Sequence, residues 1–211
     1  NSYITTKITF ANELARLCER VPNANVDIIT STLGLDKRIG PKYLKGAVAF
    51  GGPCFPRDNL SLMAFSESLG SYFPTAKSVH EYNQKQINFL VNLVIKNIKK
   101  GQAVGILGLS YKPNTDVTEK SAGMELLRSL KKNGVRTISY DPSIKSGNDL
   151  KITIRNSDLI IITTPWKEFE QINWDYYRGK IIIDCWRMID ILQYNQKINK
   201  FIQLGKYIQP S

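Results

Sequence analysis

Apolar side chains recur at helical spacing through the first half of the chain. Between Tyr3 and Arg20 they lie three or four residues apart and form one stripe of an amphipathic helix, carried by Ile4, Ile8, Ala11, Ala15 and Cys18. Similar stripes predict helices over 26–33, 58–70 and 78–100, with Gly34 and Gly70 as C-terminal stops. We therefore expect residues 1–98 to form an all-helical domain.

The pattern changes after Gly101, where short apolar runs alternate with helical spacing. Strands are expected over 103–109, 135–140, 159–164 and 180–184, and a helix over 121–133 that ends at Gly134. Short apolar strands that alternate with helices are typical of a parallel sheet covered on both faces. Residues 99–211 therefore predict a Rossmann-like α/β domain, which binds its ligand beyond the carboxyl ends of its strands.

Four turns follow the predicted strands and are the candidate ligand-binding segments of this domain. They cover residues 111–115, 141–142, 164–166 and 184–187. Gly105 and Gly108 match only part of the dinucleotide motif, and Asp141 would suit a ribose. Two glycines in a first turn equally fit tight packing, so the motif alone leaves both interpretations open.

The candidate chemistry lies in residues 51–58, which read G-G-P-C-F-P-R-D. Pro56 suits the first turn of a helix, which places Cys54 just before a helix N-terminus, where the peptide dipoles favour a thiolate nucleophile. Asp58, one turn further on, would hold a water or accept a proton. The alternative is that Cys54 is a small buried hydrophobic side chain in a tight turn, and spacing alone leaves both open.

Composition and cysteine usage exclude several classes of protein. The chain has 211 residues, 42% of them hydrophobic and 22% charged, which suits a globular protein of one large or two small domains. No apolar run reaches the roughly 18 residues of a membrane span, and no signal-peptide pattern is present. Three scattered cysteines and one histidine (His80) give neither a disulfide framework nor a zinc site. We expect a cytoplasmic, metal-free protein that does not bind membranes.

The formal net charge of +11 predicts a polyanionic partner, either a nucleic acid or a small phosphorylated substrate. The lysines are scattered singly and in pairs, and no continuous basic tract is interleaved with aromatic side chains. This distribution favours the small substrate, and we expect no nucleic-acid binding.

Two motifs in this order resemble those of a known family. Residues 51–58 match the segment G-G-S-C-F-P-K-D, with Pro53 and Arg57 as mild changes, and residues 107–116 resemble G-L-x-F-K-P-N-T-D. The whole chain resembles the middle and C-terminal parts of the UDP-glucose/GDP-mannose dehydrogenase family. The N-terminal NAD-binding domain of that family is absent from this sequence, as is its catalytic lysine, so the resemblance implies that this chain alone does not turn over.

The resemblance implies an NAD-dependent, two-step oxidation of the C6 alcohol of a nucleotide sugar, with UDP-glucose as the favoured substrate. Cys54 would form a thiohemiacetal and then a thioester, which water hydrolyses. Another nucleotide sugar (GDP-mannose or a UDP-N-acetylhexosamine) and a non-catalytic module for nucleotide-sugar binding or dimerisation remain as alternatives.

The resemblance also assigns site residues. The catalytic group would be Cys54, Asp58 and Asn1. The substrate-binding group would be Arg38, Tyr43, Lys45, Phe50, Gly51, Tyr111, Lys112 and Arg187, and the cofactor-binding group Cys54, Arg57 and Lys120. A homodimer would form through the helical domain, with Arg38 reaching the substrate of the partner subunit. Glu119 and Trp186 stand where the family has arginines.

Overall fold

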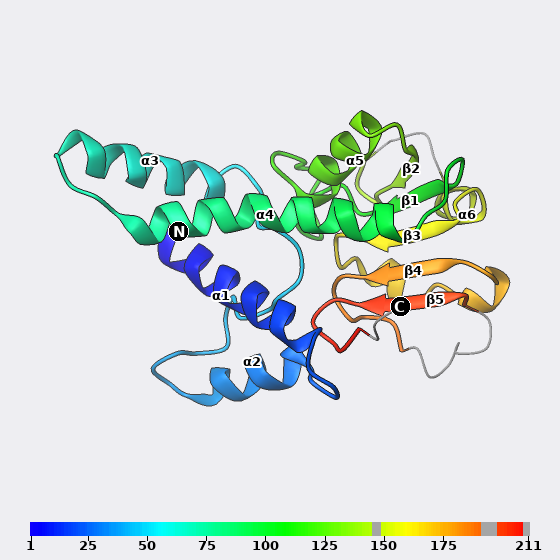
Figure 1. Cartoon of the computed structure of the whole chain (residues 1–211), viewed down its shortest axis with the longest axis horizontal. Helices are drawn as coiled ribbons and strands as arrows, with labels where there is room; N and C mark the ends of the chain where they lie inside the picture. Colours follow the sequence, from blue (N-terminus) through cyan, green and yellow to red (C-terminus); the bar gives the residue numbers. More distant parts are fainter. Residues whose placement is uncertain (145–148, 191–197, 209–211) are drawn as a thin grey trace. The chain divides into compact units, whose positions relative to one another are not determined.

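The computed structural model describes residues 1–144, 149–190 and 198–208 (Figure 1). The chain forms two compact units, one made of Asn1–Gln86 and the residues from Leu204 onward, the other of Ile87–Gln203. The predicted arrangement of a helical part followed by a parallel-sheet α/β part is confirmed. The domain limits of 1–98 and 99–211 remain predictions. Among the described residues, no helix is long and apolar enough to cross a membrane.

The first unit is built from α1 (Ser2–Cys18), α2 (Val26–Leu35), α3 (Phe55–Ser68) and the start of α4 (Pro74–Lys96). The predicted stop at Gly34 is wrong, because α2 continues to Leu35. Gly34 is needed for a different reason: a Cβ there would lie 2.9 Å from the Cα of Pro41. Its missing side chain thus serves close packing of the following loop on the helix rather than a left-handed helix end.

A short segment that follows the last strand completes the first unit. The N–H of Val26 donates to the carbonyl of Gly205 at 2.9 Å, and the N–H of Gly205 donates to the carboxylate of Glu19 at 2.8 Å. Asn25 forms an isolated antiparallel bridge with Lys206. These bonds tie the start of α2 and the end of α1 to residues that lie far away in the sequence.

The second unit contains a five-stranded, fully parallel sheet in the order β2-β1-β3-β4-β5. Its strands are β1 (Ala103–Leu107), β2 (Arg136–Tyr140), β3 (Leu159–Ile162), β4 (Ile181–Asp184) and β5 (Lys200–Gln203). Strands β1 and β3 are buried along their whole length, which explains their continuous apolar runs. The chain reverses direction across the sheet between β1 and β3, and ligands of such sheets bind at this reversal.

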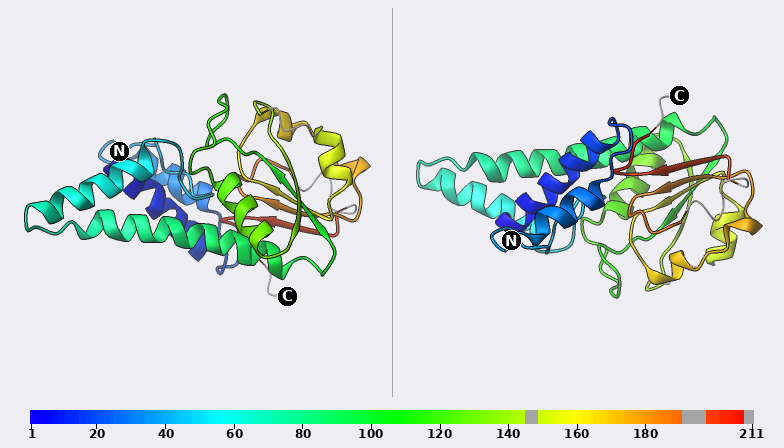
Figure 2. Two further views of the ribbon diagram at one scale, coloured as in Figure 1. Left: turned by 90° about the horizontal axis from the view of Figure 1, so that it is seen from above. Right: turned by 90° about the horizontal axis from the view of Figure 1, so that it is seen from below.

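Helices cover both faces of this sheet. They are α5 (Ala122–Lys132), α6 (Leu150–Arg155), α7 (Lys167–Glu170) and the 3-10 turn η1 (Trp174–Tyr176). Right-handed crossovers place α5 and α6 on opposite faces, and Figure 2 shows α6 and α7 together on the side away from α5. The core beneath α6 and α7 consists of fully buried side chains, including Ile154, Phe169 and Trp174 together with Leu107, Ile160, Ile162 and Ile182.

Candidate functional site

Cys54 lies at the N-terminal end of α3 and is exposed. The turn before it contains Gly52 at φ 84°, in the left-handed region that glycine adopts without strain. Pro56 stands in the first turn of the helix, where its missing N–H costs no hydrogen bond. Cys54 is therefore not the buried hydrophobic side chain that its spacing left open. Its thiol meets solvent at the positive end of the helix dipole.

Asp58 lies in the first turn of α3, and its carboxylate accepts hydrogen bonds from two side chains. Its Oδ2 accepts from Nδ2 of Asn1 at 2.5 Å, and its Oδ1 accepts from Nε of Arg57 at 3.1 Å. Its backbone N–H donates to the carbonyl of Cys54 at 2.8 Å. The hydrogen bond from Asn1, followed by that from Arg57, lowers the pKa of Asp58 below its ordinary value. The structure thus places a carboxylate one helical turn after Cys54, where it accepts a hydrogen bond from the Asn1 amide.

The loop that leads to Cys54 is held by buried amide side chains. Asn12 of α1 is 1% exposed; its Oδ1 accepts from the N–H of Ala47 at 2.7 Å and its Nδ2 donates to the carbonyl of Val48 at 3.1 Å. Gln86 of α4 donates to the carbonyl of Ala47 at 2.7 Å. These bonds satisfy backbone groups that the loop buries outside any sheet or helix.

Asn83 clamps the last part of the same loop. Its Oδ1 accepts from the N–H of Phe50 at 2.8 Å and its Nδ2 donates to the carbonyl of Phe50 at 2.9 Å. Sequence reasoning missed Asn12, Asn83 and Gln86, because their partners are backbone groups more than thirty residues away. The available signal was an amide side chain placed among apolar helix positions.

Two of the predicted sugar-binding residues of the first unit, Phe50 and Tyr43, meet at Phe55. The rings of Phe50 and Tyr43 meet the ring of Phe55 edge to face, at centroid distances of 6.3 and 6.2 Å. Gly51 is buried beside Phe50. Tyr43 and Lys45 also line a pocket of about 480 Å³ that reaches α2 at Asp27, Thr30 and Ser31.

Arg38 lies on the surface, paired with Asp36. Its side chain is 89% exposed, and its Nε and Nη2 reach the two carboxylate oxygens of Asp36 at 3.0 and 2.5 Å. This bidentate pair lowers the pKa of Asp36 and raises that of Arg38. Lys7 of α1 fixes the next residues of the loop by donating to the carbonyls of Ile39 and Gly40. The guanidinium is thereby presented to solvent from an anchored loop.

In the second unit, residues 108–120 form a loop at the carboxyl end of β1 that carries Tyr111, Lys112 and Lys120. The N–H of Tyr111 donates to the carbonyl of Val117 at 3.0 Å and closes the loop. The ammonium of Lys112 lies 5.4 Å from the ring centre of Tyr111. Lys112 and Lys120 are exposed, and Lys120 has φ 49°. The loop therefore offers two exposed cations, one of which, Lys112, lies beside an aromatic ring.

Asp141 holds the start of this loop, and its proposed suitability for a ribose is wrong. It is 1% exposed, and its Oδ2 accepts from the N–H groups of Leu109 and Ser110 at 2.7 and 2.9 Å. The Ser110 hydroxyl and the indole of Trp166 donate to the same oxygen, at 2.8 and 3.2 Å. Buried donors of the protein thus occupy the carboxylate that a ribose would need.

Trp186 and Arg187 lie in the turn after β4. The buried carboxylate of Asp184 accepts from the N–H of Trp186 at 3.0 Å, and the indole of Trp186 donates to the carbonyl of Thr163 at 2.9 Å. Arg187 adopts φ 59°, and its Nη1 donates to the carbonyl of Cys185 at 3.3 Å. Trp186 therefore links the ends of β3 and β4, a structural role that an arginine at this position would not fill in the same way.

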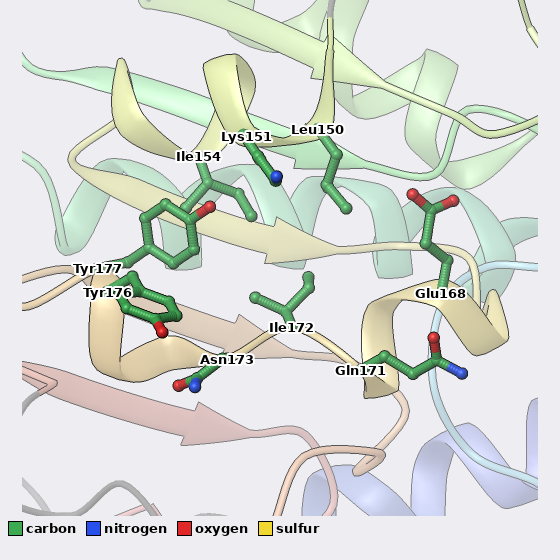
Figure 3. Close-up of a pocket in the computed structure, with 9 residues that line it drawn as sticks. All are labelled: Leu150, Lys151, Ile154, Glu168, Gln171, Ile172, Asn173, Tyr176 and Tyr177. Carbon is green, nitrogen blue, oxygen red and sulfur yellow. The ribbon is translucent and has the colours of Figure 1, made fainter.

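A separate pocket of about 310 Å³ opens between α6 and the α7–η1 segment (Figure 3). Its floor includes Ile154 and Ile172, and none of the predicted site residues lines it. Its polar rim is partly engaged within the fold. Glu168 accepts from the hydroxyl of Tyr140 at 3.0 Å, and Asn173 caps η1. Among the described residues, no group of three or more His, Cys, Asp or Glu side chains could hold a metal ion.

Comparison with known proteins identifies the two halves of the chain. Residues 1–85 match the central domain of the UDP-glucose/GDP-mannose dehydrogenase family, and residues 105–191 match its UDP binding domain. The chain belongs to this family. As a member of the UDP-glucose/GDP-mannose dehydrogenases it is related to oxidoreductases that act on nucleotide sugars.

Curated relatives include UDP-glucose 6-dehydrogenase TuaD of Bacillus subtilis, which is 32% identical over 186 residues, or 82% of this chain and 40% of that protein. The UDP-glucose 6-dehydrogenase of Rickettsia felis is 31% identical over 210 residues, or 90% of this chain and 47% of that protein. This family member thus spans less than half the length of these relatives.

Solved structures of the family share the fold. A UDP-glucose dehydrogenase from Pyrobaculum islandicum has a TM-score of 0.87 at 30% identity, over 98% of this chain and 49% of that one. A UDP-D-ManNAc dehydrogenase from Pyrococcus horikoshii has a TM-score of 0.82 at 26% identity, over 98% of this chain and 50% of that one. The family's fold therefore accommodates more than one nucleotide sugar.

Proposed function

We propose that this chain supplies the nucleophile and the nucleotide-sugar site of an NAD-dependent UDP-glucose 6-dehydrogenase. The observation that carries the proposal is the exposed thiol of Cys54 at a helix N-terminus, one turn from the Asn1–Asp58 pair. The choice of UDP-glucose rests on the curated relatives at 29 to 32% identity, which are named for that substrate. GDP-mannose, a UDP-N-acetylhexosamine and a non-catalytic binding module remain the alternatives that experiment must separate.

Cys54 would act on the aldehyde formed by the first oxidation of the C6 alcohol. Its thiolate adds to the aldehyde carbon and gives a thiohemiacetal, whose oxidation yields a thioester. Water then adds to the acyl carbon, the carbon–sulfur bond breaks, and the thiolate leaves with the carboxylate product released. NAD would accept a hydride in each of the two oxidations.

Asp58 and Asn1 would hold the hydrolytic water. Because its pKa is lowered, Asp58 remains ionised near neutral pH and accepts a hydrogen bond from the water, which orients the water's lone pair toward the acyl carbon. Asn1 supplies the amide that fixes this carboxylate. The pair therefore acts mainly by orientation, since a carboxylate with a lowered pKa is a weak base.

The cations of the chain suit a diphosphate. Lys112, beside Tyr111, would contact the sugar nucleotide, and Tyr43, Lys45, Phe50 and Gly51 would line the sugar. Arg187, on the turn after β4, is the further proposed substrate contact. Arg57 and Lys120, both exposed, are the proposed cofactor contacts, and we place most of the NAD site outside this chain.

A homodimer through the helical unit completes the proposal, with Arg38 reaching the substrate of the partner subunit. The first unit exposes large apolar side chains along α1 and α2, namely Phe10, Leu17, Ile28 and Leu35. The exposure of Arg38 from an anchored loop is consistent with a role toward a second copy.

Calorimetric titration of UDP, UDP-glucose and GDP-mannose tests the nucleotide-sugar site. We expect saturable binding of UDP that Lys112→Ala weakens about ten- to a hundredfold, because a charge-assisted contact to phosphate is lost. The exposed Lys100→Ala is the matched control and should bind like the unaltered chain. Preference for GDP-mannose would change the substrate class, and failure of all three ligands to bind would overturn the proposal.

A further inference from the structure

A second polar contact joins α1 and α3 next to the one between Asn1 and Asp58. Nδ2 of Asn59 donates to Oγ1 of Thr5 at 2.8 Å, and Thr5 in turn donates to the carbonyl of Ser2 at 2.9 Å. Thr5 lies one turn after Asn1 on the same face of α1, and Asn59 directly follows Asp58. The two helices are therefore joined by two hydrogen bonds, that of Asn1 with Asp58 at the surface and that of Thr5 with Asn59 in the interior.

The buried contact between Thr5 and Asn59 lowers the stability of the fold. Thr5 and Asn59 are both 0% exposed, and Oδ1 of Asn59 has no hydrogen-bond partner among the residues that the structure describes. A buried acceptor left unpaired carries its full desolvation cost, whereas two apolar side chains of the same shape would be neutral or stabilising here. Stability alone therefore does not explain why α1 and α3 meet through this pair.

The directionality of the hydrogen bond does explain why α1 and α3 meet through this pair. Apolar side chains attract without direction and let two helices slide, whereas a hydrogen bond between fixed atoms defines one register. We propose that Thr5 and Asn59 are positioning residues: their hydrogen bond sets the register of α1 on α3 and so holds Asn1 against Asp58. Neither side chain touches a reacting atom. The catalytic consequence rests on the proposed function, because it assumes that Asn1 and Asp58 orient the hydrolytic water.

The test uses the complete protein with Asn59→Leu, Thr5→Val, the double variant and the conservative Thr5→Ser. We expect Asn59→Leu and Thr5→Val each to lower kcat about ten- to a hundredfold with KM nearly unchanged, since a small displacement of catalytic groups has that effect. Intact-protein mass spectrometry during turnover should show the thioester on Cys54 accumulating. Thr5→Ser should retain kcat because it keeps the accepting hydroxyl.

Two further results separate positioning from support of the fold. The double variant should be no slower than either single variant, because both remove the same bond, while its thermal stability equals or exceeds that of the unaltered protein. Ser66→Ala is the matched control: it removes a buried serine hydroxyl that donates to the carbonyl of Met63 within α3, and should leave kcat and the thioester level unchanged.

The outcomes distinguish this inference from the proposed function. Unchanged kcat and no added thioester in folded Asn59→Leu and Thr5→Val would overturn the positioning role while leaving the dehydrogenase intact. If the unaltered protein oxidises no nucleotide sugar, the proposed function fails, and the register is then measured on this chain by NMR titration of Asp58. Its pKa should rise toward the ordinary value in Asn59→Leu, and an unchanged pKa would overturn the register itself.

Discussion

Asn12 and Ala47 are joined by a buried hydrogen bond of 2.7 Å, in which the side-chain oxygen of Asn12 accepts the backbone N–H of Ala47. The same side chain donates to the carbonyl of Val48. The loop that ends at Cys54 is thereby attached to the middle of α1 rather than held by its own turns. The position of the nucleophile depends on an amide far from it in the sequence.

Asn12→Leu should destabilise the first unit by about 2–4 kcal/mol, because two buried backbone groups lose their partner. Chemical denaturation monitored by circular dichroism measures the change. Asn133→Leu is the control, since Asn133 is exposed and bonds only within its own helix end; its effect should stay within about 0.5 kcal/mol. Equal effects of the two substitutions would contradict the role of Asn12.

Gly46→Ala should cost about 3 kcal/mol, because a Cβ at this position would lie 2.2 Å from the carbonyl oxygen of Ala11 and backbone would have to move. Gly40→Ala provides the comparison within the same loop. Its Cβ meets nothing within 4 Å, and only its φ of +69° is strained, at a cost of about 1–2 kcal/mol. The free energy of unfolding, measured for both variants, should fall more for Gly46→Ala than for Gly40→Ala. The reverse order would be inconsistent with the close approach of this loop to α1.

Cys54 should be the thiol that reacts in the native chain. Cys18 and Cys185 are 3% and 0% exposed, whereas Cys54 is exposed at a helix end. Iodoacetamide followed by peptide mass spectrometry should modify Cys54 alone, and Cys54→Ser should abolish labelling until denaturant is added. Modification of either of the other cysteines before unfolding would contradict the described burial.

The pKa of Asp58 should depend more on Asn1 than on Arg57. Since its pKa is lowered, Asp58 stabilises the fold above the ordinary carboxyl range, and that contribution is lost as the pH falls through the lowered pKa. Asn1→Ala should raise this pKa toward the ordinary value, and Arg57→Ala should raise it less. NMR titration of the carboxyl carbons measures both, with Asp36 as an internal control. A larger rise with Arg57→Ala would reverse the assigned order of causes.

Much of the fold could be predicted from hydrophobic spacing. The stripe of Ala11, Ala15 and Cys18 is buried as expected, and the apolar runs became the inner strands of a parallel sheet. The elements that escaped prediction are α6, α7, η1 and β5, of six, four, three and four residues. Elements this short show too few periods to be told from loops, and tertiary packing rather than local preference stabilises them.

The site was predictable where its chemistry is local and not where it depends on contacts across the chain. Cys54 and Asp58 are four residues apart, so helical geometry alone brings them together. The Thr5–Asn59 contact and the occupied carboxylate of Asp141 required knowing which segments meet. A lone acidic residue after a strand looks the same in sequence whether it faces a ligand or the protein's own N–H groups.

Because the segment after β5 completes the first unit, the order of synthesis limits when this unit can finish folding. Gly205 bonds to Val26 and Glu19, yet every residue of the parallel sheet is synthesised between them. The helical unit, although its helices come first, cannot reach its final form until the whole sheet has been translated. Until the second unit has been synthesised, the end of α1 and the start of α2 lack their contacts with the segment that contains Gly205.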